Sequence, residues 1–124
     1  MIKCKYCDSY LVNLPPNQLY KYKKELFCSN CNCSYYFIEG LVGIRFEFYA
    51  NRYYFTIVHD YINNTTYIKG KYYPPVVIKD KEQAAEYKYK EPLKEKVFEQ
   101  RFDSIVNINP HNAKDKVKLY MLFS

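Results

Sequence analysis

Five cysteines within the first 33 residues constrain this chain more than any other feature of its sequence. The first pair reads Cys4-Lys-Tyr-Cys7, and the remaining three lie within the segment CSNCNC, at positions 28, 31 and 33. Two residues between thiolates let one tight turn direct both sulfurs at a single ion, and a second such turn completes a tetrahedron. The spacing therefore predicts one structural Zn²⁺ bound by two cysteine pairs, Cys4, Cys7, Cys28 and Cys31.

The residue that follows each pair supports two matching turns. In such turns this residue often adopts a left-handed conformation, which Gly, Asn and Asp tolerate best, and the chain has Asp8 and Asn32 there. When the two turns are aligned, Cys33 falls opposite Ser9, so we interpret Cys33 as a small residue at the start of a strand. Two alternatives remain open: Cys33 replaces Cys31 as a ligand, or all five cysteines are free thiols or disulfides.

These two turns, CKYCD and CSNCN, resemble the knuckles of the zinc-ribbon family over residues 1–40. They lack the Pro and Gly that are frequent in that family's knuckles. The resemblance implies two short hairpins around a structural metal ion. It does not imply one function, because zinc ribbons occur in transcription factors, polymerase subunits, ribosomal proteins, nucleases and structural inserts.

Residues 41–79 are rich in aromatic and β-branched residues, which predicts an antiparallel β-meander. A two-residue turn at Asn51-Arg52 would pair residues 44–48 with 55–59 and place one apolar set on a single face: Ile44, Phe46, Phe48, Phe55, Ile57 and His59. A second two-residue turn at Asn63-Asn64 would place Ile68 opposite His59 and Thr66 opposite Tyr61. Residues 76–80 then read as a last edge strand.

Residues 80–124 show a helical pattern. Asp80 resembles a helix cap before EQAAEYKYK, and apolar residues recur at helical spacing between Leu93 and Ile105. Asn109-Pro110 favours the start of a final helix, although VKLYMLF also alternates as a strand would. The predicted fold class is α+β, with a zinc ribbon (1–40), a β-meander (41–79) and a helical C-terminal segment (80–124) in one compact unit.

The formal net charge of +6 suggests an anionic partner, but a tetrathiolate zinc site would reduce this charge by two. Lys, Asn, Tyr and Ile also far outnumber Gly, Ala, Pro and Arg, which indicates an AT-rich source genome and codon bias. A short reading frame of this composition fits a viral origin. The charge alone is therefore weak support for nucleic-acid binding.

The sequence argues against an enzyme, a membrane protein or a small-molecule-binding protein. Four thiolates leave a zinc ion no open coordination position, and no glycine-rich phosphate loop or Ser/His/Asp set is present. His59 falls on the predicted apolar face and His111 at a predicted helix start. Because no apolar run is long enough for a membrane span or a signal peptide, we expect a cytoplasmic protein.

Cations and aromatic rings suggest where a macromolecule would bind. Three lysines, Lys21, Lys23 and Lys24, lie between the cysteine pairs, and five further residues share the outward face of the predicted meander: Arg45, Tyr49, Tyr54, Tyr67 and Lys69. Rings between cations can stack on bases and neutralise phosphates. We therefore expect a nucleic-acid-binding accessory module, and the alternative is a zinc-stabilised protein-interaction module, since exposed tyrosines also suit protein interfaces.

Overall fold

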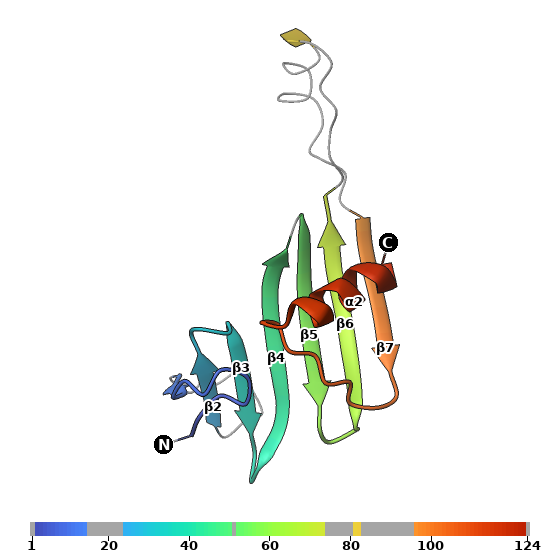
Figure 1. Cartoon of the computed structure of the whole chain (residues 1–124). Coiled ribbons are helices and arrows are strands. Elements are labelled where there is room, and N and C mark those ends of the chain that lie inside the picture. Colours follow the sequence, from blue (N-terminus) through green and yellow to red (C-terminus); the bar gives the residue numbers. More distant parts are fainter. Residues whose placement is uncertain (1, 15–23, 51, 74–80, 83–95, 124) are drawn as a thin grey trace.

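The computed structural model describes residues 2–14, 24–50, 52–73, 81–82 and 96–123. In this part of the chain, seven strands form one antiparallel sheet in the order β1 to β7. The bounds are β1 (Val12–Asn13), β2 (Lys24–Cys28), β3 (Cys33–Phe37), β4 (Leu41–Ala50), β5 (Tyr53–Asp60), β6 (Thr65–Tyr72) and β7 (Lys96–Phe102). Helix α2 (Ala113–Phe123) lies across one face of the sheet, over β5 to β7 (Figure 1).

The predicted α+β class with C-terminal helices is wrong, because the segment from Lys96 to Phe102 is strand β7. Phe98 and Phe102 lie four residues apart, a spacing that fits both a helical face and a strand face. Exposure separates the two readings: Val97 is 68% exposed, and it lies on the face opposite Phe98. As a strand, this segment pairs with the edge of β6 and extends the sheet, which a helix could not do.

The final helix is confirmed as α2, but it begins later than Asn109-Pro110. Asn112 caps it, since its side-chain oxygen accepts the Lys114 N–H at 2.9 Å and its carbonyl accepts the Lys116 N–H at 3.1 Å. The helix predicted between residue 80 and Pro92 and the edge strand predicted at 76–80 lie almost entirely outside the described residues; within them, residues 81–82 are helical. No helix in the described ranges is long and apolar enough to cross a membrane.

The first predicted hairpin is confirmed and the second is wrong by two residues. Ala50 pairs with Tyr53, and Arg52 between them has a φ of 68°. In the second hairpin, Asp60 pairs with Thr65, so the loop has four residues where two were predicted. The Asp60 carboxylate accepts the backbone N–H groups of residues 62 and 63 at 3.0 and 3.2 Å, which stabilises this longer turn.

One face of the sheet forms the core. Its buried side chains alternate along the strands and include Leu26, Cys28, Cys33, Tyr35, Ile44, Phe46, Phe55, Ile57, His59, Thr66 and Ile68. Leu119 of α2 and Ile108 cover this face, and Tyr6 packs edge-on against Phe46 with ring centroids 4.9 Å apart. The predicted boundary after residue 40 lies in the turn between β3 and β4, which are neighbours in the sheet.

Gly70 allows the aromatic side of this core to pack closely. A Cβ atom at this position would lie 2.4 Å from the Tyr54 carbonyl oxygen and 2.5 Å from the Phe98 ring. Phe98 is the residue of β7 that pairs with Gly70. Because Gly70 has no side chain, the Phe98 ring can lie directly against the backbone of β6.

Candidate metal centre

The two predicted cysteine turns have the expected backbone conformation. Asp8 has a φ of 59° and Asn32 a φ of 53°, so both residues that follow a cysteine pair are left-handed. The Tyr6 N–H donates to the Cys4 sulfur at 3.5 Å, and the Cys31 N–H donates to the Cys28 sulfur at 3.4 Å. Backbone N–H groups therefore orient the first sulfur of each pair.

All five cysteine sulfurs lie close together. The Sγ atoms of Cys4, Cys28, Cys31 and Cys33 are all within 4.8 Å of one another, a group that could hold a metal ion. The Cys7 Sγ lies 3.5 Å from that of Cys28, and the Cys4 Sγ lies 3.7 Å from that of Cys31. Because Zn–S bonds are about 2.3 Å, sulfurs at the corners of a tetrahedron around zinc lie about 3.8 Å apart. The spacing of the sulfurs fits such an ion.

The chain contains one cysteine more than a tetrahedral site requires. Cys33 is the first residue of β3 and is 1% exposed, so it lies in the core beside Cys28, with which it pairs. Burial raises the pKa of Cys33, Cys28 and Cys31. Hydrogen bonds with Asn30 and then Ser9 lower the pKa of the Cys7 thiol to about 5. The sulfurs of Cys7 and Cys33 both lie beside sulfurs of the other three cysteines. The choice of Cys7 as the fourth ligand stays a prediction.

Two residues that the sequence analysis did not assign to this centre also contact its sulfurs. The buried Tyr35 hydroxyl accepts the Lys5 N–H at 2.9 Å and lies 3.2 Å from the Cys4 sulfur, to which it can donate its own hydrogen. The His111 Nε2 lies 2.9 Å from the Cys31 sulfur. The strand alternation that buries Cys33 could have identified Tyr35, two residues later, whereas no local pattern links His111 to a cysteine 80 residues away.

Five of the eight predicted nucleic-acid contacts lie on one face of the sheet. The register places Arg45, Tyr49, Tyr54, Tyr67 and Lys69 on the face of the sheet opposite the core. We call this surface the open face; it also carries the buried Thr56 and further residues of mixed type, which are Glu25, Glu47, Val58, Asp60, Lys71, Val97, Glu99 and Arg101. Lys24 lies at the start of β2, away from the five predicted contacts, and Lys21 and Lys23 lie outside the described residues.

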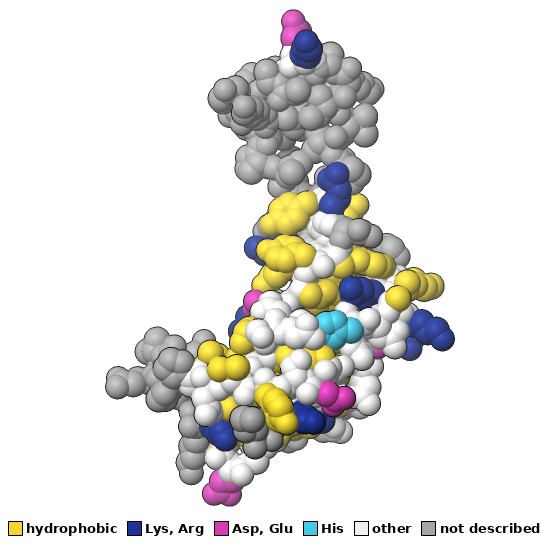
Figure 2. Space-filling model, turned by 60° about the vertical axis from the view of Figure 1, so that its left-hand side comes forward, with side chains coloured by type: hydrophobic (Ala, Val, Ile, Leu, Met, Phe, Trp, Pro, Cys, Tyr) yellow, Lys and Arg dark blue, Asp and Glu magenta, His cyan; other side chains and the backbone are white. Residues whose placement is uncertain are grey.

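Carboxylates accompany the cations and tyrosines of the open face. Arg45 forms a 2.7 Å ion pair with Glu47, and Lys69 pairs in register with Glu99. Burial and a hydrogen bond with Glu47 raise the pKa of Tyr54, and a hydrogen bond with Glu99 raises that of Tyr67. Figure 2 shows another side of the molecule, on which Lys and Arg side chains also lie scattered among apolar and acidic ones. The open face is therefore close to charge-balanced.

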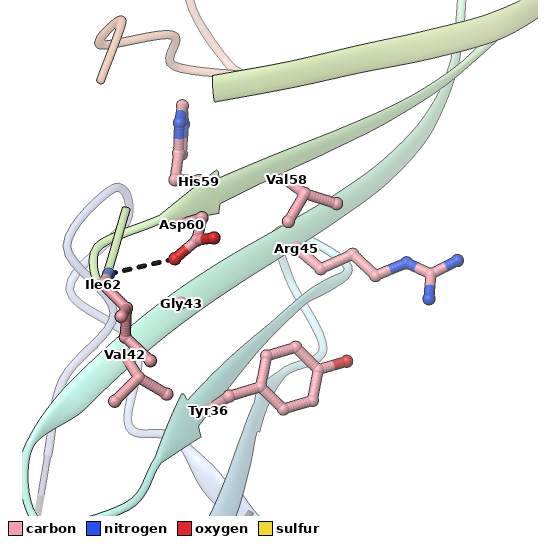
Figure 3. A pocket seen from close by; sticks show the side chains of 8 residues that line it. All are labelled: Tyr36, Val42, Gly43, Arg45, Val58, His59, Asp60 and Ile62. Atoms are coloured by element: carbon pink, nitrogen blue, oxygen red, sulfur yellow. Dashed lines mark hydrogen bonds between the residues drawn. The ribbon is translucent and has the colours of Figure 1, made fainter. Parts of the chain in front are cut away.

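A hollow of about 310 Å³ lies at one end of the open face. In Figure 3 the side chains of Tyr36, Val58 and Arg45 surround it, whereas the His59 side chain points away toward the core. Asp60 also lines it, but its carboxylate is engaged in the turn described above, and the Asn63 amide donates to its second oxygen at 2.7 Å. The two charged side chains that line this hollow, Asp60 and Arg45, therefore both have partners nearby.

Comparisons of the chain with protein-family models, with curated proteins and with solved structures found no match. The resemblance to zinc ribbons therefore depends on the two cysteine turns alone. The arrangement of residues described here is a cysteine cluster of metal-binding geometry at one end of an antiparallel sheet.

Proposed function

We propose that the chain is a non-catalytic, zinc-stabilised binding module with one structural Zn²⁺ bound by Cys4, Cys7, Cys28 and Cys31. The observation that supports this best is the separation of 3.5 and 3.7 Å between sulfurs of different turns, close to the edge of a zinc tetrahedron. Thiolates are soft ligands that suit Zn²⁺, and two turns of this kind leave no open position for a substrate.

Contacts among the sulfurs favour Cys7 over Cys33 as the fourth ligand. The Cys7 sulfur lies 3.5 Å from that of Cys28, and the Cys4 sulfur lies 3.7 Å from that of Cys31, so each of these four sulfurs has a close partner in the other turn. The Cys33 sulfur lies within 4.8 Å of those of Cys4, Cys28 and Cys31, but among the described residues no sulfur pair as close as these two is seen for it. Cys33 is then a buried neighbour of the centre, and its thiol can remain protonated.

Ligand substitution tests this assignment. In metal analysis of the purified, reduced protein we expect one zinc per chain in the wild type and in Cys33→Ser. Cys7→Ser and Cys31→Ser should lose zinc, with an affinity loss greater than the roughly 100-fold that a change outside the ligand shell can cause. Retention of zinc by Cys7→Ser together with its loss from Cys33→Ser would assign Cys33 as the ligand instead.

The charge pattern of the open face favours a protein partner for this module over nucleic acid. A phosphate backbone attracts surfaces with unpaired cations, whereas Arg45 and Lys69 have Glu47 and Glu99 beside them. Tyr49 is 79% exposed and Val97 68%, so the face presents aromatic and apolar area between mixed charges. We infer a partner protein whose surface is itself mixed in charge and partly apolar.

Binding titrations distinguish the two classes of partner. We expect no salt-dependent binding to single- or double-stranded DNA or RNA at 50 and 200 mM salt. Proteins cross-linked to the wild type in its native cell should be lost with Tyr49→Asp plus Val97→Asp and kept with Val117→Asp, an exposed site on α2. Salt-sensitive binding to nucleic acid that is abolished by Lys69→Glu would support nucleic-acid recognition and contradict the protein-partner proposal.

A further inference from the structure

The cysteine cluster receives a contact from the far end of the chain. The His111 Nε2 lies 2.9 Å from the Cys31 sulfur, although 80 residues separate them in sequence. His111 belongs to the short loop that precedes α2, the helix that covers the core face (Figure 1). This contact therefore links the metal centre to the element that closes the core.

Hydrogen bonds fix the loop that carries His111. The Asn109 side-chain oxygen accepts the His111 N–H at 2.9 Å, and the Asn109 carbonyl accepts the Asn112 N–H at 3.0 Å. At the other end, the Asp115 carboxylate accepts the Asn109 N–H at 2.8 Å. Asn112 also caps α2. The imidazole is therefore held at the sulfur by a loop that is rigidly joined to the helix.

The geometry indicates a hydrogen bond to a bound sulfur and not a fifth ligand. Zn–N bonds of about 2.0–2.1 Å and Zn–S bonds of about 2.3 Å place two ligand atoms of one tetrahedron about 3.5 Å apart. The observed 2.9 Å is shorter than this and is a hydrogen-bond distance.

We propose that His111 donates its Nε2–H to the zinc-bound Cys31 thiolate, so that zinc binding docks the segment from Ser104 to Phe123 onto the sheet. This inference depends on the proposed zinc site. A thiolate that shares its charge with a metal is a strong acceptor, and a neutral imidazole with hydrogen on Nε2 is the matching donor. Leu119, 1% exposed, and the Val106 N–H, which donates to Thr66 at 2.9 Å, anchor the same segment farther along the sheet.

His111 variants provide a direct test because the side chain is exposed and its removal leaves no core cavity. In competition titrations we expect His111→Ala to bind one zinc per chain about 10- to 100-fold more weakly than the wild type. His111→Gln should recover part of this loss, since its amide can still donate. Asn107→Ala, also exposed, is the matched control and should bind like the wild type.

Hydrogen exchange measures the docking itself. Zinc should slow amide exchange across residues 104–123 in the wild type and in Asn107→Ala, and much less in His111→Ala at saturating zinc. Equal affinity and equal zinc-dependent protection in His111→Ala would overturn the inference while leaving the zinc site intact. A wild-type Co²⁺ spectrum typical of three sulfurs and one nitrogen, with the nitrogen lost in His111→Ala, would make His111 a ligand and would also overturn it. A wild type that binds no metal would instead refute the proposed function.

Discussion

Removing zinc from the reduced protein with a strong chelator is expected to unfold β1 to β3 while β5 to β7 stay folded. Structural zinc in small peptides contributes on the order of 10–16 kcal/mol, which matches or exceeds the typical stability of a whole domain, about 5–15 kcal/mol. Little else holds β1, which has two residues, and Lys3 and Tyr10 form only an isolated bridge; β2 adds Leu26 to the core, but its other buried side chain is the proposed ligand Cys28. β5 and β6 have their own core partners, among them Phe55, Ile57 and Ile68.

Amide exchange followed by mass spectrometry measures this result strand by strand. Protection should disappear in residues 24–37 after chelation and return when zinc is added back. Cys33→Ser is the matched control and should respond like the wild type. Unchanged protection in β2 and β3 after complete zinc removal would mean that the sheet and not the metal stabilises this region.

Acid is expected to destabilise the fold through His59. This residue is fully buried, its Nδ1 lies 3.0 Å from the Thr66 hydroxyl, and its Nε2 has no partner among the described residues. Burial and then the positive charge of Lys5 lower the pKa of His59 to about 4, against about 6.5 in an unfolded chain. Between these two values the unfolded state binds more protons than the folded state, so stability must fall as pH falls.

The size of this effect follows from the separation of the two values. Each unit is worth about 1.4 kcal/mol, so His59 should cost about 3 kcal/mol of stability between pH 6.5 and pH 4, with little change outside that window. Denaturant unfolding of the wild type and His59→Leu across this range measures the difference and removes effects common to both proteins, such as zinc loss. Parallel stability curves would show that His59 does not titrate in this way.

Local patterns were enough to predict the cysteine turns and the first hairpin. Asp8 and Asn32 are left-handed as expected, because that conformation depends on the side chain at the position itself. The pairing of Phe46 with Ile57 followed from one turn and a period of two. These features depend on a few neighbouring residues, and the sequence contains all of them.

The errors arose where a distant partner decided the structure. The spacing of the apolar residues in β7 also fits a helix, but pairing with the edge of β6 made this segment a strand. In the second hairpin the Asp60 carboxylate stabilises a turn two residues longer than the one predicted from Asn63-Asn64. Propensity was overridden in the first case by pairing, and in the second by a side-chain hydrogen bond.

The sequence by itself determined that two cysteine turns would fold around one site and that an antiparallel meander would follow. Only the tertiary structure decided that Cys33 would lie among the same sulfurs, and that the loop before α2 would bring His111 to Cys31. The reason is physical: a turn is specified by the residues within it, whereas a contact across 80 residues exists only after the sheet has formed and the helix has packed on it.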